Sequence, residues 1–388
     1  MSRRITITIP SLSLGGAEGV AAMMANHWAA EGDQVTLLTL DSAETDTFEL
    51  APEVQRIALG LMRDSGNLLQ AVVNNRQRVR KLRAEIARSR PDVVISLTDR
   101  MNVLTLLAAG KAAYPVIVSE RSDPRYHLMG RVWSYLRKKT YPRAAAVVVQ
   151  TQGVSDFCRP WFPATRIEVI PNAVPAPRSA GIPKVTEEIV KARPASHVVL
   201  GMGRLSHEKG FDMLIDAFSN LADDFPDWKL RILGEGPLRE TLQATIDQRG
   251  LQAQIELPGW VADPELALDQ GDLFVLPSRY EGFPNALLQA MSRGLPCIGF
   301  DCQGSLADLS MRELKALLLP TKNQRELTSI HALEDLMRSL MVDEKSLKEL
   351  ALLSLQASEK FSIPRYFASW DQLIKESLAG SEKKCSST

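Results

Sequence analysis

Residues 273–296 constrain the fold of this chain more than any other stretch. The apolar run LFVL at residues 273–276 is closed by Pro277, which predicts a short strand buried in a parallel sheet. A loop containing Gly282 follows, and then an apolar helix that ends at Gly294. A strand, a glycine-containing loop and a helix in this order are typical of an α/β fold.

This strand, loop and helix unit also predicts an anion-binding corner. We expect Asn285 to cap the helix, whose first turn then presents unpaired N–H groups to the loop. Glu281 lies in that loop, and a carboxylate there would repel a bare phosphate. The expected partner is therefore a hydroxyl-rich group joined to a phosphate, such as a sugar phosphate. Two other roles for Glu281, a helix cap or an ion pair with Arg279, remain open from this loop alone.

A second glycine-rich loop lies upstream, at residues 201–210. It carries Gly203 and two cations, Arg204 and Lys209, between an apolar strand and a helix. Such a loop suits a diphosphate, because glycine lets the backbone wrap the phosphates and the two cations neutralise their charge. Together with Glu281 in a loop of the same kind, it indicates a site for a sugar carried on a diphosphate.

The sequence YEGFPNALLQAM at residues 280–291 resembles the donor-site signature of the retaining glycosyltransferases of family 4. In that family a glutamate is followed by seven residues and a second glutamate. The first acid falls on Glu281, whereas the second position is Gln289, which is a departure. In the family the second acid binds the ribose hydroxyls of the nucleotide. An amide keeps one acceptor and adds two donors, so the departure bears mainly on donor affinity.

The resemblance implies an α/β fold of the GT-B type, with two Rossmann-like domains facing each other across a cleft. The implied limits are 1–175 for an acceptor domain, 176–196 for a linker, 197–360 for a nucleotide-sugar domain and 361–388 for a helix crossing back. Arg204 and Lys209 hold the diphosphate in this scheme, and Glu281 orients the sugar. The implied donor-binding residues are Gly15, Gly16, Gly203, Gly259, Gly282, Phe283, Pro284, Asn285 and Gln289.

The implied chemistry needs no cofactor, no metal and no protein nucleophile. In the resembled family the departing phosphate oxygen can take the proton of the acceptor on the same face of the sugar. The two cations replace a metal, and the chain contains no Asp-x-Asp motif.

Acceptor contacts are expected from the first half of the chain. ERSDP at residues 120–124 follows an apolar strand, where ligands of parallel sheets collect. Asp123 and His127 are the candidates for a contact with the acceptor or the sugar, although a packed or solvent-exposed histidine is an equally good interpretation of His127.

Charge is distributed unevenly along the chain. Residues 1–175 carry 22 Lys and Arg against 16 Asp and Glu, while the remainder carries 24 against 30. An arginine-rich helix at residues 70–89 and a basic, aromatic segment at 125–143 suggest contact with a phospholipid or a polyprenyl phosphate. Solvated helix faces explain the same pattern, and no nucleic-acid motif accompanies it.

Cysteine spacing and hydropathy indicate the compartment. The four cysteines have no metal-like or disulfide-like spacing, and no apolar run approaches the roughly 18 residues of a membrane-spanning helix. We expect a cytoplasmic protein, with peripheral contact at the inner face of a membrane.

The sequence therefore predicts transfer of a hexose from a UDP-sugar to a lipid-linked or oligosaccharide acceptor, for surface polysaccharide assembly on a polyprenyl diphosphate. One alternative is a GT-B relic that binds a sugar nucleotide or a partner transferase, suggested by Gln289. Another is an NAD-dependent dehydrogenase. That class requires a Gly-x-Gly-x-x-Gly fingerprint, which is absent, and Asp41 is the only acid at the end of the second strand.

Overall fold

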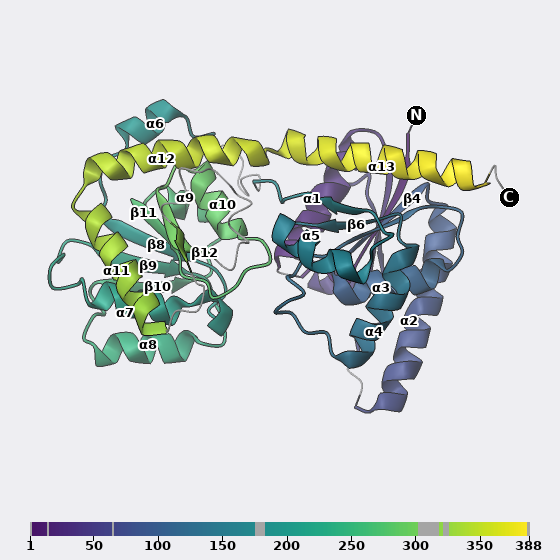
Figure 1. Cartoon of the computed structure of the whole chain (residues 1–388), viewed down its shortest axis with the longest axis horizontal. Helices are drawn as coiled ribbons and strands as arrows, with labels where there is room; N and C mark the ends of the chain where they lie inside the picture. The colour runs from purple at the N-terminus through teal and green to yellow at the C-terminus, as the bar shows by residue number, and fades with distance from the viewer. Residues whose placement is uncertain are drawn as a thin grey trace. The chain divides into compact units, whose positions relative to one another are not determined.

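Two parallel β-sheets organise the chain, one in each of two units (Figure 1). The computed structural model describes residues 2–13, 15–63, 66–174, 183–301, 318–320 and 326–385. The first unit combines Met1–Asn172 with Tyr366–Thr388, and the second is Ala173–Arg365. Part of the segment expected as a linker belongs to the second unit, because α6 (Glu187–Ala192) packs there through Val190 against Ala351 and Leu355. Its remainder at 176–182 lies outside the described residues.

The sheet of the first unit has the strand order β3-β2-β1-β4-β5-β6-β7. Its strands are β1 (Arg4–Ile9), β2 (Gln34–Thr39), β3 (Gln55–Ala58), β4 (Val93–Leu97), β5 (Val116–Ser119), β6 (Ala146–Val149) and β7 (Ile167–Val169). Its helices are α1 (Gly16–Ala30), α2 (Leu68–Ser89), α3 (Asp99–Ala109), α4 (Arg131–Thr140), α5 (Gln152–Cys158) and α13 (Ile363–Cys385). The order reverses between β1 and β4, the kind of switch point where open α/β sheets bind ligands.

From Tyr366 onward, the C-terminal helix α13 packs on helix α1 of the first unit. Trp370 is fully buried and meets Trp28 edge to face, with ring centroids 6.4 Å apart. The indole nitrogen of Trp28 donates to a carboxylate oxygen of Asp371 at 3.1 Å. These contacts bury the apolar face of α13 and return the end of the chain to the unit in which it begins.

The sheet of the second unit has the order β10-β9-β8-β11-β12-β13. Its strands are β8 (Val198–Met202), β9 (Lys229–Leu233), β10 (Ile255–Gly259), β11 (Leu273–Leu276), β12 (Cys297–Asp301) and β13 (Leu318–Pro320). Besides α6, its helices are α7 (Phe211–Ser219), α8 (Arg239–Gln248), α9 (Pro264–Leu268), α10 (Asn285–Ser292), α11 (Glu326–Met341) and α12 (Glu344–Ser358). Here the order reverses between β8 and β11, so the loops after these two strands emerge side by side.

The expected capping role of Asn285 is wrong. Helix α10 begins at Asn285 itself, and Pro284 occupies the N-cap position without a side-chain cap. The backbone nitrogen of Asn285 donates to the carbonyl of Phe283 at 3.0 Å, which forms a tight turn one residue earlier than a cap at Asn285 requires. The sequence pattern located the start of the helix to within one residue but misassigned the cap.

Candidate functional site

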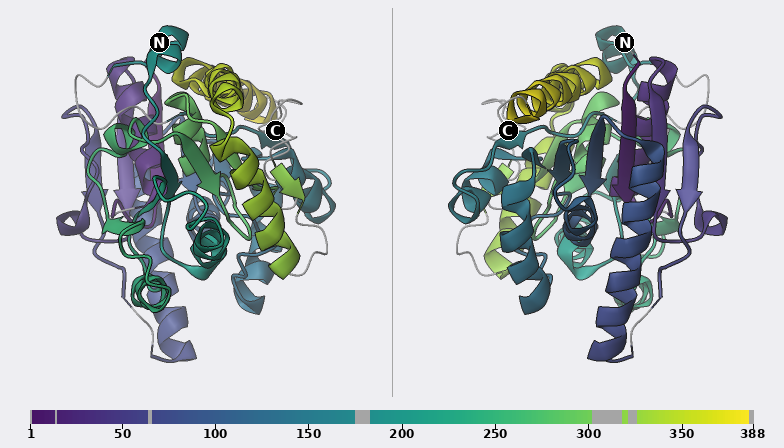
Figure 2. Two further views of the ribbon diagram at one scale, coloured as in Figure 1. Left: turned by 90° about the vertical axis from the view of Figure 1, so that its left-hand side faces the viewer. Right: turned by 90° about the vertical axis from the view of Figure 1, so that its right-hand side faces the viewer.

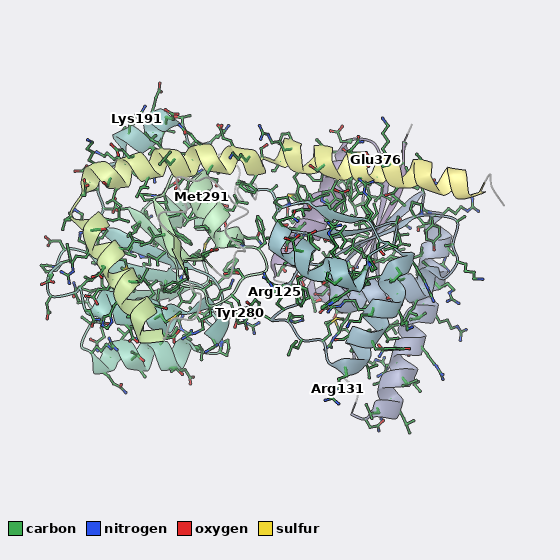
Figure 3. All side chains as sticks on the ribbon, in the orientation of Figure 1. Arg125, Arg131, Lys191, Tyr280, Met291 and Glu376 are labelled. Atoms are coloured by element: carbon green, nitrogen blue, oxygen red, sulfur yellow. The ribbon has the colours of Figure 1, made fainter. Side chains whose placement is uncertain are left out.

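Two loops at the carboxyl edge of the second sheet are joined by a buried ion pair. They are residues 203–210, between β8 and α7, and residues 277–284, between β11 and α10; we call them the β8 loop and the β11 loop. Tyr280 marks the β11 loop in Figure 3. The Lys209 Nζ atom lies 2.7 Å from Glu281 Oε1 and 2.8 Å from Oε2. Ser278 Oγ also donates to Glu281 Oε1, at 2.7 Å.

Burial makes this ion pair structurally demanding. The Glu281 side chain is 5% exposed and that of Lys209 is 24% exposed. A buried carboxylate without a partner would be costly, and the ammonium and the Ser278 hydroxyl satisfy it. The sequence left open an ion pair of Glu281 with Arg279. In the structure, Glu281 pairs with Lys209. Arg279 itself forms a bidentate pair with Asp212, at 2.8 and 2.7 Å.

Backbone contacts join the same two loops. The Arg279 backbone nitrogen donates to the carbonyl of Glu208 at 2.8 Å, and its guanidinium donates to the carbonyl of His207 at 2.9 Å. Gly210 has a φ of +66°, and a Cβ atom there would lie 2.1 Å from the carbonyl oxygen of Pro277. Only glycine fits both that conformation and that approach. The sequence therefore specifies how closely the loops meet.

Arg204 lies on the same β8 loop and is exposed. Among the residues that the structure describes, its guanidinium takes part in no ion pair. The aliphatic part of Lys209 passes over Gly203, 3.6 Å from where a Cβ atom would stand. The loop thus presents one cation held by a carboxylate and one cation to solvent.

Gln289, the departure from the family pattern, contacts an acid that sequence analysis missed. Its Nε2 atom donates to Glu265 Oε1 at 2.5 Å. Glu265 lies in α9 and is only 2% exposed. No motif in the sequence marks Glu265, because α9 is a short helix that begins at Pro264. The contact of Glu265 with Gln289 joins two different helices and has no local signature.

The other predicted donor residues have mixed surroundings. Gly282 is half-buried in the β11 loop, and Gly259 ends β10 with a φ of +87°. Phe283 is buried and meets Phe361 edge to face at 6.3 Å, so it also belongs to the apolar core of the second unit. Their roles in donor binding stay predictions.

In the first unit, the predicted glycine pair lies at the start of α1. The helix begins at Gly16, and Gly15 is its N-cap residue in an extended conformation. A Cβ atom on Gly15 would lie 2.2 Å from a carboxylate oxygen of Glu18. Burial raises the pKa of Glu18, and Ser11 Oγ lies 3.4 Å from its carboxylate.

The two candidate acceptor residues have partners within the first unit. Asp123 is buried and pairs with Arg125 at 2.6 Å, so its charge is balanced locally (Arg125 is labelled in Figure 3). The exposed His127 places its Nε2 atom 3.3 Å from Asp99 Oδ2. Sequence analysis missed Asp99, the first residue of α3, because no spacing links it to His127.

Glu120 is the most perturbed acid in this region. It is 3% exposed, accepts a hydrogen bond from Tyr141 and lies 3.6 Å from Arg137. Burial raises its pKa to about 7, which the nearby guanidinium only partly opposes.

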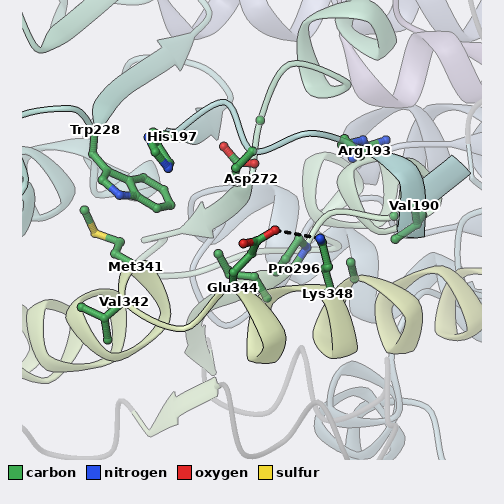
Figure 4. A pocket seen from close by; sticks show the side chains of 15 residues that line it. Val190, Arg193, His197, Trp228, Asp272, Pro296, Met341, Val342, Glu344 and Lys348 are labelled. Carbon is green, nitrogen blue, oxygen red and sulfur yellow. Dashed lines mark ion pairs between the residues drawn. The ribbon is translucent and has the colours of Figure 1, made fainter.

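A cavity of about 130 Å³ lies elsewhere in the second unit (Figure 4). His197, stacked on Trp228 at 5.3 Å, lines it together with Asp272 and the ion pair of Glu344 with Lys348. His197, Trp228 and Asp272 immediately precede β8, β9 and β11. The cavity is therefore at the amino edge of the sheet, opposite the loops that carry Lys209 and Glu281.

Two family models match the two halves of the chain. Residues 15–173 match the glycosyl transferase 4-like domain, and residues 186–351 match the glycosyl transferases group 1. A Campylobacter jejuni protein is 25% identical over 374 residues, 96% of this chain and 98% of that protein. It is the GalNAc-alpha-(1->4)-GalNAc-alpha-(1->3)-diNAcBac-PP-undecaprenol alpha-1,4-N-acetyl-D-galactosaminyltransferase.

Solved structures share the fold of the whole chain. Sucrose-phosphate synthase from Thermosynechococcus elongatus superposes with a TM-score of 0.78 at 17% identity, covering 97% of this chain and 99% of that one. Anabaena Alr3699/HepE in complex with UDP and glucose gives 0.72 at 19% identity, covering 97% and 99%.

The fold is thus that of the two-domain GT-B glycosyltransferases. The chain belongs to the glycosyltransferases, with a 4-like domain followed by a group 1 domain. In the described part of the chain, no helix combines the length and the hydropathy needed to cross a bilayer.

The raised pKa of Glu120 predicts that the stability of the fold depends on pH. Its pKa is about 7 in the folded protein and about 4.5 when unfolded, so the folded state keeps a proton that the unfolded chain releases. Stability should therefore fall as pH rises through this window. Between about pH 5 and about pH 8, wild type should lose about 2 to 3 kcal/mol relative to Glu120→Gln, measured by urea unfolding. Glu31→Gln, at an exposed acid, is the control, and parallel profiles for wild type and Glu120→Gln would contradict this assignment.

Proposed function

We propose that this chain transfers a hexose from a UDP-sugar to a glycan hydroxyl, with retention at the anomeric carbon. The observation that carries the proposal is the contact of Lys209 with Glu281, which joins the β8 and β11 loops. It sets a cation for the diphosphate beside an acid for the sugar hydroxyls, next to the N-terminus of α10.

The cations act on the charge that develops during transfer. The leaving diphosphate becomes more negative in the transition state, and Lys209 and Arg204 are placed on one loop to stabilise it. Glu281 fixes the Lys209 ammonium before the donor binds, so little reorganisation is needed. Since two cations supply the charge, we propose that turnover requires no metal.

The relatives support the classes of donor and acceptor. The Campylobacter relative is named for a glycan on PP-undecaprenol, and HepE was solved with UDP and glucose. We infer a UDP-sugar donor and a polyprenyl-diphosphate-linked acceptor in surface polysaccharide assembly. The second candidate function is that of a GT-B relic, which binds a UDP-sugar without turning it over. Gln289, in the position of the family's second acid, is the residue that suggests it.

A panel of UDP-sugars tests this function directly. We expect UDP release with one hexose donor, in the presence of a polyprenyl-diphosphate-linked glycan and of EDTA. Proton NMR of the product should show the anomeric configuration of the donor. Binding of UDP-sugars without release for every acceptor would favour the relic, and an inverted product would contradict retention.

Removing the central ammonium should abolish most transfer and also lower the unfolding temperature, because it leaves the buried Glu281 carboxylate without its cation. Lys209→Ala should lower kcat by roughly 10²–10³, the usual effect of losing an electrostatic group in a transition state. Lys229→Ala is the matched control, because Lys229 is a half-exposed lysine on β9 of the same unit. Thermal unfolding of both variants monitors folding, and near-normal turnover by a folded Lys209→Ala protein would contradict the assignment.

The first unit carries a surface suited to a membrane, and we propose that it docks there. Leu68 and Leu69, at the start of α2, are 86% and 80% exposed. The N-terminal end of α2 projects from this unit in both views of Figure 2, and α4 begins on the same side, where Figure 3 labels Arg131. The exposed apolar side chains of this part of the unit are Met62, Leu68, Leu69, Val72, Val73, Leu128, Val132 and Tyr135.

Cations surround this apolar patch. Arg76 and Arg80 follow Val72 on the same face of α2 at helical spacing, and both are exposed. Exposed Arg131, Lys138 and Lys139 lie on α4 (Arg131 is labelled in Figure 3). An apolar face bordered by cations suits the headgroup region of an anionic bilayer, where the apolar chains insert and the cations meet phosphates.

Vesicle binding tests this surface. The double variant Leu68→Ser/Leu69→Ser should lose most binding to vesicles containing anionic phospholipid, measured by co-sedimentation, since it removes two of the most exposed apolar side chains. Turnover of a water-soluble acceptor should be unchanged. Ile189→Ser, an exposed apolar residue of the second unit, is the control. Equal binding by both variants and wild type would contradict a docking role for α2.

A further inference from the structure

The carboxylate of Glu265 is buried, and only one of its two oxygens accepts a hydrogen bond from the described residues. Its Oε1 atom accepts from Gln289 at 2.5 Å, whereas its Oε2 atom is buried and has no hydrogen-bond partner among the residues that the structure describes. In the part of the chain that the structure describes, no cation lies within ion-pair distance of it. A carboxylate in this position is costly unless further donors reach it.

The position of Glu265 restricts which donors these can be. Gln289 lies one helical turn beyond Asn285 on α10, so the Glu265–Gln289 pair lies roughly 6 Å along the helix from its N-terminal end. A diphosphate at that N-terminus could not also face Glu265, because two anions would repel each other. Neutral hydroxyl groups, a short distance from the diphosphate, are the donors that suit an unpaired carboxylate oxygen.

We propose that Glu265 binds the ribose hydroxyls of the donor nucleotide through its free Oε2 atom. The inference rests on the proposed function, which supplies a nucleoside diphosphate in this unit. Glu265 is then a donor-specificity residue, and the negative charge comes from α9 rather than from position 289 of α10. Gln289 has the complementary task of holding the carboxylate through its amide.

This arrangement explains why position 289 carries an amide in this chain. A glutamate at 289 would bring a second carboxylate within hydrogen-bond distance of Glu265, and two such groups cannot both ionise at little cost. Restoring the family acid alone should therefore harm the site. Exchanging the two residues keeps one acid and one amide, so the double variant Glu265→Gln/Gln289→Glu should recover binding.

The test measures UDP and 2′,3′-dideoxy-UDP binding to the full-length protein by isothermal titration. Glu265→Gln should bind UDP about 10- to 100-fold more weakly than wild type, the usual effect of losing a charged hydrogen-bond partner. With dideoxy-UDP, which lacks both ribose hydroxyls, wild type and Glu265→Gln should bind equally. Gln289→Glu should bind UDP weakly, and the exchanged double variant should return to within a few-fold of wild type.

Each contrary outcome overturns a different statement. Unchanged UDP binding by Glu265→Gln, or an equal loss of affinity for both nucleotides, overturns the ribose contact. Wild-type-like binding by Gln289→Glu overturns the pairing argument. Wild type that is folded in thermal unfolding and binds no nucleoside diphosphate overturns the proposed function, and this inference with it. Should Glu265→Gln unfold, the exchanged double variant alone still decides, since its failure to bind UDP contradicts the proposal.

Discussion

The ion pair of Lys209 with Glu281 is the interaction on which the candidate site depends. It joins loops that follow two neighbouring strands, β8 and β11, and it buries an acid that would otherwise destabilise the second unit. The sheet order brings these loops together, because the order in which the strands are added reverses between β8 and β11. The pair then converts a common property of α/β folds into a specific arrangement of one cation and one acid.

The surrounding contacts explain why this geometry is rigid. Gly210 allows the β8 loop to approach Pro277 closely, and Arg279 ties the β11 loop to the backbone of His207 and Glu208. A preorganised cation stabilises developing charge without reorganising during the reaction, which is what an electrostatic site requires. The acid at Glu265 extends the same logic, since its amide partner on α10 fixes one oxygen and leaves the other for a ligand.

Sequence analysis predicted the features that have a local cause. The apolar strands and their glycine-rich loops follow from hydrophobic periodicity and from the glycine and proline positions, so the α/β class and the loops carrying Lys209 and Glu281 could be inferred from the residues. The GT-B fold was implied only by the resemblance to a known family. Contacts between distant segments could not be inferred. The pairing of Glu265 with Gln289, and of Asp99 with His127, has no signature in spacing, and the cap of α10 fell on Pro284 because a tight turn overrode the usual preference.

A crystal structure of the protein with bound UDP tests the central claim most directly. The account predicts the diphosphate at the N-terminal end of α10, within hydrogen-bond distance of Lys209 Nζ, with the Arg204 guanidinium turned toward it. Glu281 should remain beside Lys209 on the side away from the uridine. UDP bound elsewhere in the second unit, with Lys209 and Arg204 making no contact with its phosphates, would contradict the account.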